Sequence, residues 1–326
     1  MKCTNKFAFI LIMVLVASSL SACSKAEIRM PFSSFQIEED GNSGLEFSKN
    51  NALLNGYAFE LASFTEDYTE NYNLANAGAG LLVDINNKKV LFAQNAFEQK
   101  YPASITKIFT ALIALKHCNI DETIVCTDAC SKLPDDAVKL GLRSGDTLTL
   151  DQALHLALIS SYNDAAIAIA CHVSGTEEEF SKLMNEEARK LGATSSNFTD
   201  ASGLGGENHY TSAYDLYLIF NEFVKYPELL EIIQANEYST TYHDKNGAEL
   251  SASGKSTNQF FRGLYSLPEN VTVVGGKTGT TSEAGYCLLL LVRDTYSNPY
   301  IAVVLGSDSR DNLYEEMTQM LRTIIN

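Results

Sequence analysis

The feature of the sequence that most restricts the fold is the position of its strand-like segments, which lie at the two ends of the patterned region. The apolar runs 81–85 and 90–93 flank "NNKK", a pattern typical of a β-hairpin. Far along the chain, "GYCLLLLVRD" and "YIAVVLGSDS" are separated by "SNP", and a helical pattern follows in "DNLYEEMTQMLRTIIN". The sequence between these ends is mainly helical. We therefore expect an α+β fold, with one antiparallel sheet built from both chain ends and a helical region inserted between them.

The charge of the chain restricts its partners. Its 326 residues are 45% hydrophobic, which is enough for a sizeable core in one large or two modest domains. The formal net charge of −16 argues against nucleic acid as a partner, because phosphate binding needs clustered Lys and Arg. We find no repeat, and we expect little room for a second folded domain.

The N-terminus has the pattern of an export signal. Lys2 and Lys6 precede an apolar run, Phe7–Ala17, about half as long as the ~20 residues that span a bilayer. The run closes in "LSAC" at Cys23, which resembles the bacterial lipobox. We expect residues 1–22 to be a lipoprotein signal peptide, and the chain to be exported and lipid-anchored through Cys23 to the outer face of the bacterial cytoplasmic membrane. A plain secretory signal is the alternative.

The segment that follows, residues 23–75, is acidic and weakly patterned, as in "SFQIEEDGNSG". Such a composition favours a tether, in which "ALLNGYAFELAS" is the one candidate for a short helix. We therefore expect the folded domain to occupy residues 76–326.

The remaining cysteines say little about function. Without Cys3 and Cys23 they number five: Cys118, Cys126, Cys130, Cys171 and Cys287. The stretch "HCNIDETIVCTDAC" suggests zinc ligands, but no second C-x-x-C or H-x-x-x-H pair supports them, so we expect no metal. We expect buried free thiols, with a single disulfide in this loop as the alternative.

The stretch "PASITKIFTALIAL" places a lysine in an apolar segment. Pro102 and the spacing of the apolar residues predict a helix start, and Ser104 and Lys107 would share one side of its first turn. A buried ammonium is costly, so such a lysine is either paired or neutral. A lysine that extends to solvent explains an isolated S-x-x-K pattern equally well.

Two further stretches could contact a ligand. In "LISSYNDAAIAIA" we expect a helix over about 150–160, a break at residues 161–163 and a second helix after Asp164, although a capping turn explains the break as well. In "VTVVGGKTGTTSEAG", glycines allow close backbone approach, and the lysine and threonines could hold a carboxylate. An exposed hairpin turn and a phosphate loop are the alternatives, but the spacing does not fit a phosphate loop.

Together, S-x-x-K, S-x-N and K-T-G, with intervals of 57 and 116 residues, form the signature of penicillin-recognising serine acyltransferases. Further stretches, such as "FSKLMNEEARKLGATSSNFTDASGL", resemble the serine D-alanyl-D-alanine carboxypeptidases, the low-molecular-mass penicillin-binding proteins. The resemblance covers roughly residues 76–308. It implies a β-lactamase/transpeptidase-like fold and a carboxypeptidase catalytic domain at 76–326. It also implies peptidoglycan stem peptides and β-lactam antibiotics as partners, and no cofactor.

The resemblance also implies roles for individual residues. Ser104 would attack the carbonyl of the penultimate D-Ala, and neutral Lys107 would be its base, favoured by burial and by the charge of Lys277. Ser161 would relay a proton to the leaving amine. The substrate-binding residues would be Asn163 for the substrate amide, Lys277, Thr278, Gly279 and Thr280 for the terminal carboxylate, and the N–H groups of Ser104 and Thr280 for the oxyanion.

Some features depart from the family pattern. Its C-terminal β domain and amphipathic helix are not found, and we expect the Cys23 lipid to replace them as anchor. Thr280 and Thr281 stand where many carboxypeptidases have a bulky residue, which leaves substrate preference open. A class A-like β-lactamase is the nearest alternative, but "SSNFTDASGL" lacks its deacylating glutamate, and Tyr162 replaces its S-D-N aspartate. A catalytically silent sensor, an endopeptidase and a transpeptidase also stay open.

Other polar residues are interpreted as structural. We expect His209 and Asp215 to order the loop after Gly203, and His155 to be a satisfied core residue. Asn258 could lie near a cleft rim, and we assign it no role.

Overall fold

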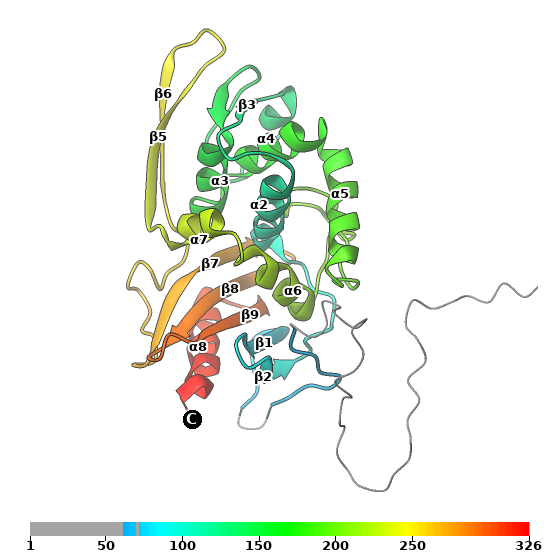
Figure 1. The fold of residues 1–326 in the computed structure, drawn as a ribbon, viewed down its shortest axis with the longest axis vertical. Coiled ribbons are helices and arrows are strands. Elements are labelled where there is room, and N and C mark those ends of the chain that lie inside the picture. The colour runs from blue at the N-terminus through cyan, green and yellow to red at the C-terminus, as the bar shows by residue number, and fades with distance from the viewer. Residues whose placement is uncertain (1–60, 70–71, 326) are drawn as a thin grey trace, which may run out of the picture. The chain divides into compact units, whose positions relative to one another are not determined.

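The structure is a computed structural model that describes residues 61–69 and 72–325. The predicted signal peptide, Cys23 and the tether up to residue 60 lie outside these residues. The regular elements, drawn in Figure 1, are β1 (Ala79–Asp84), β2 (Lys89–Gln94), η2 (Ala103–Ile105), α2 (Thr106–His117), β3 (Thr123–Val125), η3 (Asp128–Ser131), β4 (Thr147–Thr149), α3 (Leu150–Ile159), α4 (Asn163–Ser174), α5 (Glu177–Lys190), α6 (Ala213–Phe223), α7 (Pro227–Gln234), β5 (Glu237–His243), β6 (Glu249–Lys255), β7 (Val271–Thr281), β8 (Gly285–Asp294), β9 (Pro299–Ser307), α8 (Arg310–Leu321) and η4 (Arg322–Ile325).

The main sheet is antiparallel and has five strands in the order β2-β1-β9-β8-β7. Strand β1 pairs with its hairpin partner β2 on one side and with β9 on the other, so that Gly80 lies opposite Val304. The sheet is therefore built from both ends of the patterned region, and the predicted α+β architecture is confirmed.

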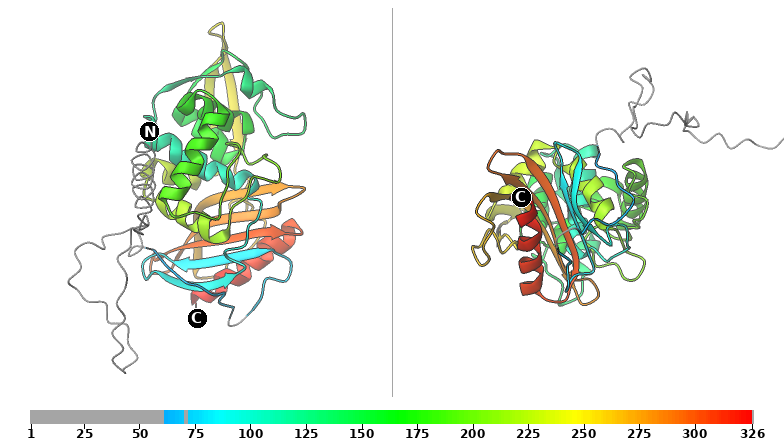
Figure 2. Two further views of the ribbon diagram at one scale, coloured as in Figure 1. Left: turned by 90° about the vertical axis from the view of Figure 1, so that its right-hand side faces the viewer. Right: turned by 90° about the horizontal axis from the view of Figure 1, so that it is seen from below.

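Both faces of this sheet are covered, which explains the unbroken apolar run in β8. Leu289 and Leu291 face the core shared with the helical region, whereas Leu288 and Leu290 face the core under α8. Figure 2 shows α8 lying along the face opposite the other helices. Four apolar residues at helical spacing in α8 are buried against this face: Leu313, Met317, Met320 and Leu321.

Helix α2 is the centre of the helical region, because every residue from Thr106 to Ala114 is buried. The turn η2 precedes it, so the first turn of the predicted helix has 3₁₀ rather than α geometry. Within the described part of the chain, no helix is both long enough and apolar enough to cross a membrane.

A second sheet, of the order β3-β4-β5-β6, was not predicted. Its longest strands form the hairpin β5–β6, which extends beyond the helices in Figure 1. Strand β5 reads "EYSTTYH" and its residues are mostly exposed or half-buried, so an apolar alternation is nearly absent. The sequence signal fails here because these strands bury little apolar surface.

The expected start of the domain at residue 76 is too late. Ala62 is buried, and its N–H donates to the hydroxyl of Tyr217 (2.9 Å). Tyr68 exchanges two backbone hydrogen bonds with Ala93, at 2.7 and 2.9 Å, and Leu74 lies in the core beneath α8. The described part of the acidic segment therefore packs on the domain, because its scattered apolar residues occupy pockets that no local periodicity reveals.

Candidate active site

Ser104 lies in η2, and strand β7 passes directly beside it. The preceding residue, Ala103, has a φ of 48°, a left-handed conformation that is rare outside glycine and tends to occur at functional sites. A Cβ atom on Gly279 would lie 2.6 Å from the carbonyl oxygen of Pro102 and 3.1 Å from the nitrogen of Ser104. Glycine is therefore required for β7 to approach the serine this closely.

Lys107 has no exposed surface, which excludes the interpretation that it extends to solvent. Its Nζ donates to three oxygens: Ser104 Oγ at 2.9 Å, Asn163 Oδ1 at 2.6 Å and the carbonyl of Ser202 at 2.7 Å. The structure thus brings together the S-x-x-K pair and the asparagine of S-x-N, although Lys107 and Asn163 are 56 residues apart in the chain.

Burial lowers the pKa of Lys107 to about 7, although the carboxylates of Asp200 and Asp164 act in the opposite direction. An amine with this pKa is substantially neutral near pH 7, whereas an ordinary lysine is almost fully charged. A neutral amine beside a serine hydroxyl can accept the hydroxyl proton.

Ser161 and Lys277 form a second hydroxyl–amine pair. Ser161 lies between α3 and α4 with a φ of 62°, and Lys277 Nζ donates to its Oγ at 2.9 Å. Burial, and then the positive charge of Lys107, lower the pKa of Lys277 well below that of an ordinary lysine. Because this repulsion is mutual, protonation of both lysines at once is disfavoured.

The S-x-N segment is built differently from a capping turn. Helix α4 begins at Asn163 itself, slightly earlier than predicted, and its N-cap residue Tyr162 makes no side-chain capping bond. The Asn163 amide oxygen is instead used by Lys107. The Tyr162 hydroxyl donates to the carbonyl of Ser253 at 2.9 Å, which ties this segment to β6.

The K-T-G segment lies within strand β7, so the exposed-turn alternative is wrong. The phosphate-loop alternative is also wrong, because β8 follows instead of a helix. The hydroxyls of Thr278 and Thr257 are 2.5 Å apart, and exposed Thr280 donates its hydroxyl to the carbonyl of Gly279. Thr257 was not singled out from the sequence, whereas its neighbour Asn258 is buried and hydrogen-bonds the N–H of Phe260.

Asp200 and Ser202 were missed as site residues. Asp200 Oδ1 accepts the N–H groups of Ser202 (2.7 Å) and Gly203 (2.6 Å), and this turn aims the Ser202 carbonyl at Lys107. Burial alone would raise the pKa of Asp200, but His209 and the Ser202 donors hold it well below its usual range. An aspartate two residues before Ser-Gly is typical of such a turn and is the signal that could have found it.

The three polar residues interpreted as structural from the sequence, His209, Asp215 and His155, make hydrogen-bond or stacking contacts with neighbouring residues. His209 Nε2 lies 2.9 Å from Thr106 Oγ1, and Asp215 accepts the N–H of Ser195 at 2.8 Å, so both order the loop beside the site. His155 stacks on Tyr238 with ring centroids 4.1 Å apart, and its Nδ1 lies 2.9 Å from the carbonyl oxygen of Asp151.

A serine hydroxyl bonded to a wholly buried lysine, beside a second hydroxyl–lysine pair at a sheet edge, defines the class of penicillin-recognising serine acyltransferases. The fold agrees with this class. The crystal structure of the Streptomyces K15 DD-transpeptidase superposes with a TM-score of 0.69 at 24% identity, over 76% of this chain and 96% of that one.

The chain belongs to the D-alanyl-D-alanine carboxypeptidase family Peptidase_S11, which matches residues 66–309. It is 31% identical over 252 residues to D-alanyl-D-alanine carboxypeptidase DacF of Bacillus subtilis, covering 75% of this chain and 61% of that protein. It is 29% identical over 280 residues to D-alanyl-D-alanine carboxypeptidase DacD of Escherichia coli, covering 83% and 67%. The chain thus spans about two thirds of the length of these relatives.

Proposed function

We propose that this chain is a serine D-Ala-D-Ala carboxypeptidase that removes the terminal D-Ala from peptidoglycan stem peptides. The observation that carries the proposal is the 2.9 Å contact between Lys107 Nζ and Ser104 Oγ, with the lysine fully buried and its pKa lowered to about 7. Membership in the carboxypeptidase family supports the choice of substrate.

In the proposed reaction, Ser104 Oγ attacks the carbonyl carbon of the penultimate D-Ala while its proton passes to neutral Lys107. The peptide C–N bond then breaks, and the terminal D-Ala leaves after its nitrogen takes a proton relayed by Ser161. The product is an ester of Ser104. Water then attacks the ester carbon, the bond between that carbon and Ser104 Oγ breaks, and one water proton passes through Lys107 to Oγ as the shortened peptide leaves.

The substrate-binding roles follow from the positions of the remaining residues. Lys277, Thr278 and Thr280 would hold the terminal carboxylate, because one amine and two hydroxyls, all hydrogen-bond donors, lie on the strand that passes Ser104. The close approach of Gly279 to the nitrogen of Ser104 supports an oxyanion hole made by the N–H groups of Ser104 and Thr280. Asn163 would hydrogen-bond the substrate amide.

The direct test is release of D-Ala from a diacetyl-Lys-D-Ala-D-Ala peptide by the purified chain, measured by an assay for free D-alanine. We expect release with multiple turnovers. No release from a folded chain would favour the catalytically silent sensor, and cleavage of cross-linked muropeptides without release of terminal D-Ala would favour an endopeptidase.

Slow turnover of penicillin distinguishes this function from that of a β-lactamase. Loop 195–204 contains no glutamate, and its one acidic residue, Asp200, is held in its own turn, with Oδ1 accepting backbone N–H groups and Oδ2 lying 3.3 Å from His209 Nδ1. We expect a fluorescent penicillin to label the chain in a single burst of one equivalent, with a label that persists after free drug is removed. Rapid loss of label as hydrolysed drug accumulates would favour the β-lactamase.

We further propose that the chain is exported and anchored to the membrane by a lipid on Cys23. The support is the sequence alone, in which a short apolar run preceded by Lys2 and Lys6 ends in "LSAC". We expect cells expressing the full chain to incorporate labelled fatty acid into it and to retain it in the membrane fraction. The Cys23→Ala variant should lose the label, whereas Cys3→Ala should keep it. Fatty-acid labelling that survives in Cys23→Ala would contradict the assignment.

A further inference from the structure

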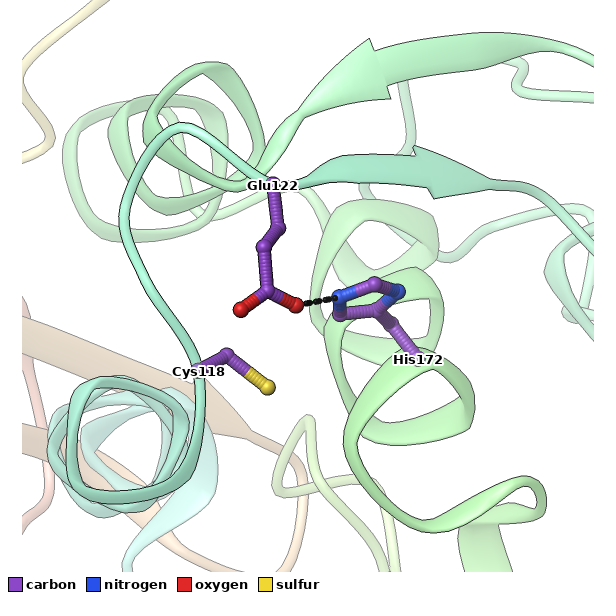
Figure 3. Close-up of side chains that lie close together, drawn as sticks. All are labelled: Cys118, Glu122 and His172. Atoms are coloured by element: carbon purple, nitrogen blue, oxygen red, sulfur yellow. Dashed lines mark hydrogen bonds and ion pairs between the residues drawn. The ribbon is translucent and has the colours of Figure 1, made fainter.

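A second cluster of reactive side chains lies at the other ends of the helices that carry the active site. Cys118, Glu122 and His172 converge there, as Figure 3 shows. The thiol sulfur, a carboxylate oxygen and a ring nitrogen all lie within 4.8 Å of one another, and His172 Nε2 is 3.0 Å from Glu122 Oε2. In the described part of the chain, no other group of three such side chains is this close.

The backbone around the cluster holds the three side chains in place. Cys118 is the C-cap residue of α2, and its N–H donates to the carbonyl of Ala114 at 2.8 Å. Glu122 lies in the turn before β3, where its carbonyl accepts the N–H of Leu150. His172 is in the last turn of α4. Two helix ends and one hydrogen-bonded turn therefore present one donor atom each to the same point, which favours a preorganised site.

We propose that Cys118, Glu122 and His172 bind a divalent transition-metal ion, with zinc as the fitting metal. A thiolate, an imidazole nitrogen and a carboxylate oxygen are the three ligand types that zinc takes in proteins. The His172 and Glu122 side chains are 20% and 38% exposed, so solvent can supply a fourth ligand. Two anionic ligands and one neutral ligand balance the charge of a divalent ion.

A neighbouring residue supports the orientation of Glu122. The other carboxylate oxygen, Oε1, accepts the backbone N–H of Asn119 at 2.7 Å and its side-chain amide at 3.0 Å. These bonds leave Oε2 directed at His172, as an outer layer of hydrogen bonds does around many metal ligands.

This site differs from the zinc ligands considered in the sequence. Of those residues only Cys118 belongs to it, whereas His117 is exposed and the thiols of Cys126 and Cys130 contact each other elsewhere. All five cysteines in the described residues are free, so the alternative of one disulfide in the loop that contains Cys118, Cys126 and Cys130 is wrong. The partners of Cys118 come from 4 and 54 positions along the chain, a spacing that no short motif covers.

The ion would have a structural role. The 12-residue helix α2 places Cys118 on the order of 16 Å from Lys107, at ~1.5 Å per residue, which is too far for contact with the substrate. The ion would join the C-terminal ends of α2 and α4, whose N-terminal ends carry Lys107 and Asn163. Zinc binding should therefore raise the temperature of unfolding.

The test uses the purified full chain and cobalt(II), which reports a thiolate ligand by a near-ultraviolet charge-transfer band. We expect this band to saturate at one equivalent and zinc to displace it. Cys118→Ser should abolish the band, and Glu122→Gln and His172→Ala should weaken binding at least about ten-fold. Cys171→Ser, which removes a buried thiol next to His172 in the chain, should keep it. A band that persists in Cys118→Ser, or no saturation, would overturn the proposal.

A measurement on the unaltered chain tests the site independently of how the variants fold. Among the cysteines that the structure describes, Cys118 is the least buried, so iodoacetamide should modify it before the other four, with each site located by mass spectrometry. We expect one equivalent of zinc to slow modification of Cys118 at least about ten-fold without changing that of the others. Equal rates with and without zinc would show that Cys118 is not a ligand.

Discussion

Replacement of Ser104 by alanine is expected to abolish both D-Ala release and covalent labelling by penicillin, a loss of at least about a thousand-fold in rate. The hydroxyl is the one group in contact with Lys107 Nζ that can form an ester with the substrate. Without it, neither reaction has an attacking atom. D-alanine release and gel fluorescence with a labelled penicillin measure the two losses.

The change should leave the fold intact, because Ser104 is half-buried and its hydroxyl accepts a single hydrogen bond from Lys107. A matched control is Ser160→Ala, which removes a nearby hydroxyl that has no hydrogen-bond partner. We expect Ser160→Ala to react at close to the unaltered rate. Penicillin labelling of Ser104→Ala at the normal rate would mean that another residue is the nucleophile.

Replacement of Lys107 by arginine is expected to reduce acylation by penicillin at least about a thousand-fold. Arginine keeps a positive charge at every accessible pH, so it cannot accept the Ser104 proton. The rate of acylation is measured by stopped-flow or by timed labelling. Full acylation by Lys107→Arg would show that the base is a different group, even though the family assignment would stand.

The pH dependence of the unaltered chain tests the same role without a mutation. Burial lowers the pKa of Lys107 to about 7, and the reaction needs the neutral form. The acylation rate should therefore be low in acid and rise as the pH passes through about 7. Because arginine itself could disturb this buried position, Lys107→Ala provides a second variant, in which added small amines should partly restore acylation. Absence of both the pH rise and the rescue would contradict the assignment.

Much of the site could be predicted from the sequence because its residues occur in short motifs. Ser104 and Lys107 are three apart in one helical turn, Ser161 and Asn163 are two apart, and Lys277 begins four consecutive candidate site residues. Each motif taken alone also had a structural interpretation. The occurrence of all three motifs in order along the chain favoured the catalytic interpretation. The two ends of the sheet were predictable for a similar reason, since β8 and β9 are long apolar runs.

The features that were missed depend on contacts between distant segments. The Ser202 carbonyl reaches Lys107 across 95 residues, and the second sheet joins polar strands with little apolar pattern. The segment before residue 76 packs through single residues such as Ala62 and Leu74. A periodicity or a motif cannot report these contacts, because each is made by one isolated side chain or carbonyl.

The sequence by itself determined the fold class and the family and indicated the candidate nucleophile, because apolar periodicity and three short motifs are local properties of the chain. The tertiary structure alone decided the electrostatic state of the site. The pKa of Lys107 falls, as its proposed role as base requires, because packing removes the amine from water, and the carboxylates of Asp200 and Asp164 limit this fall. The burial of a side chain and the effect of nearby charges on its pKa depend on all the residues around it, and these residues come together only when the chain folds.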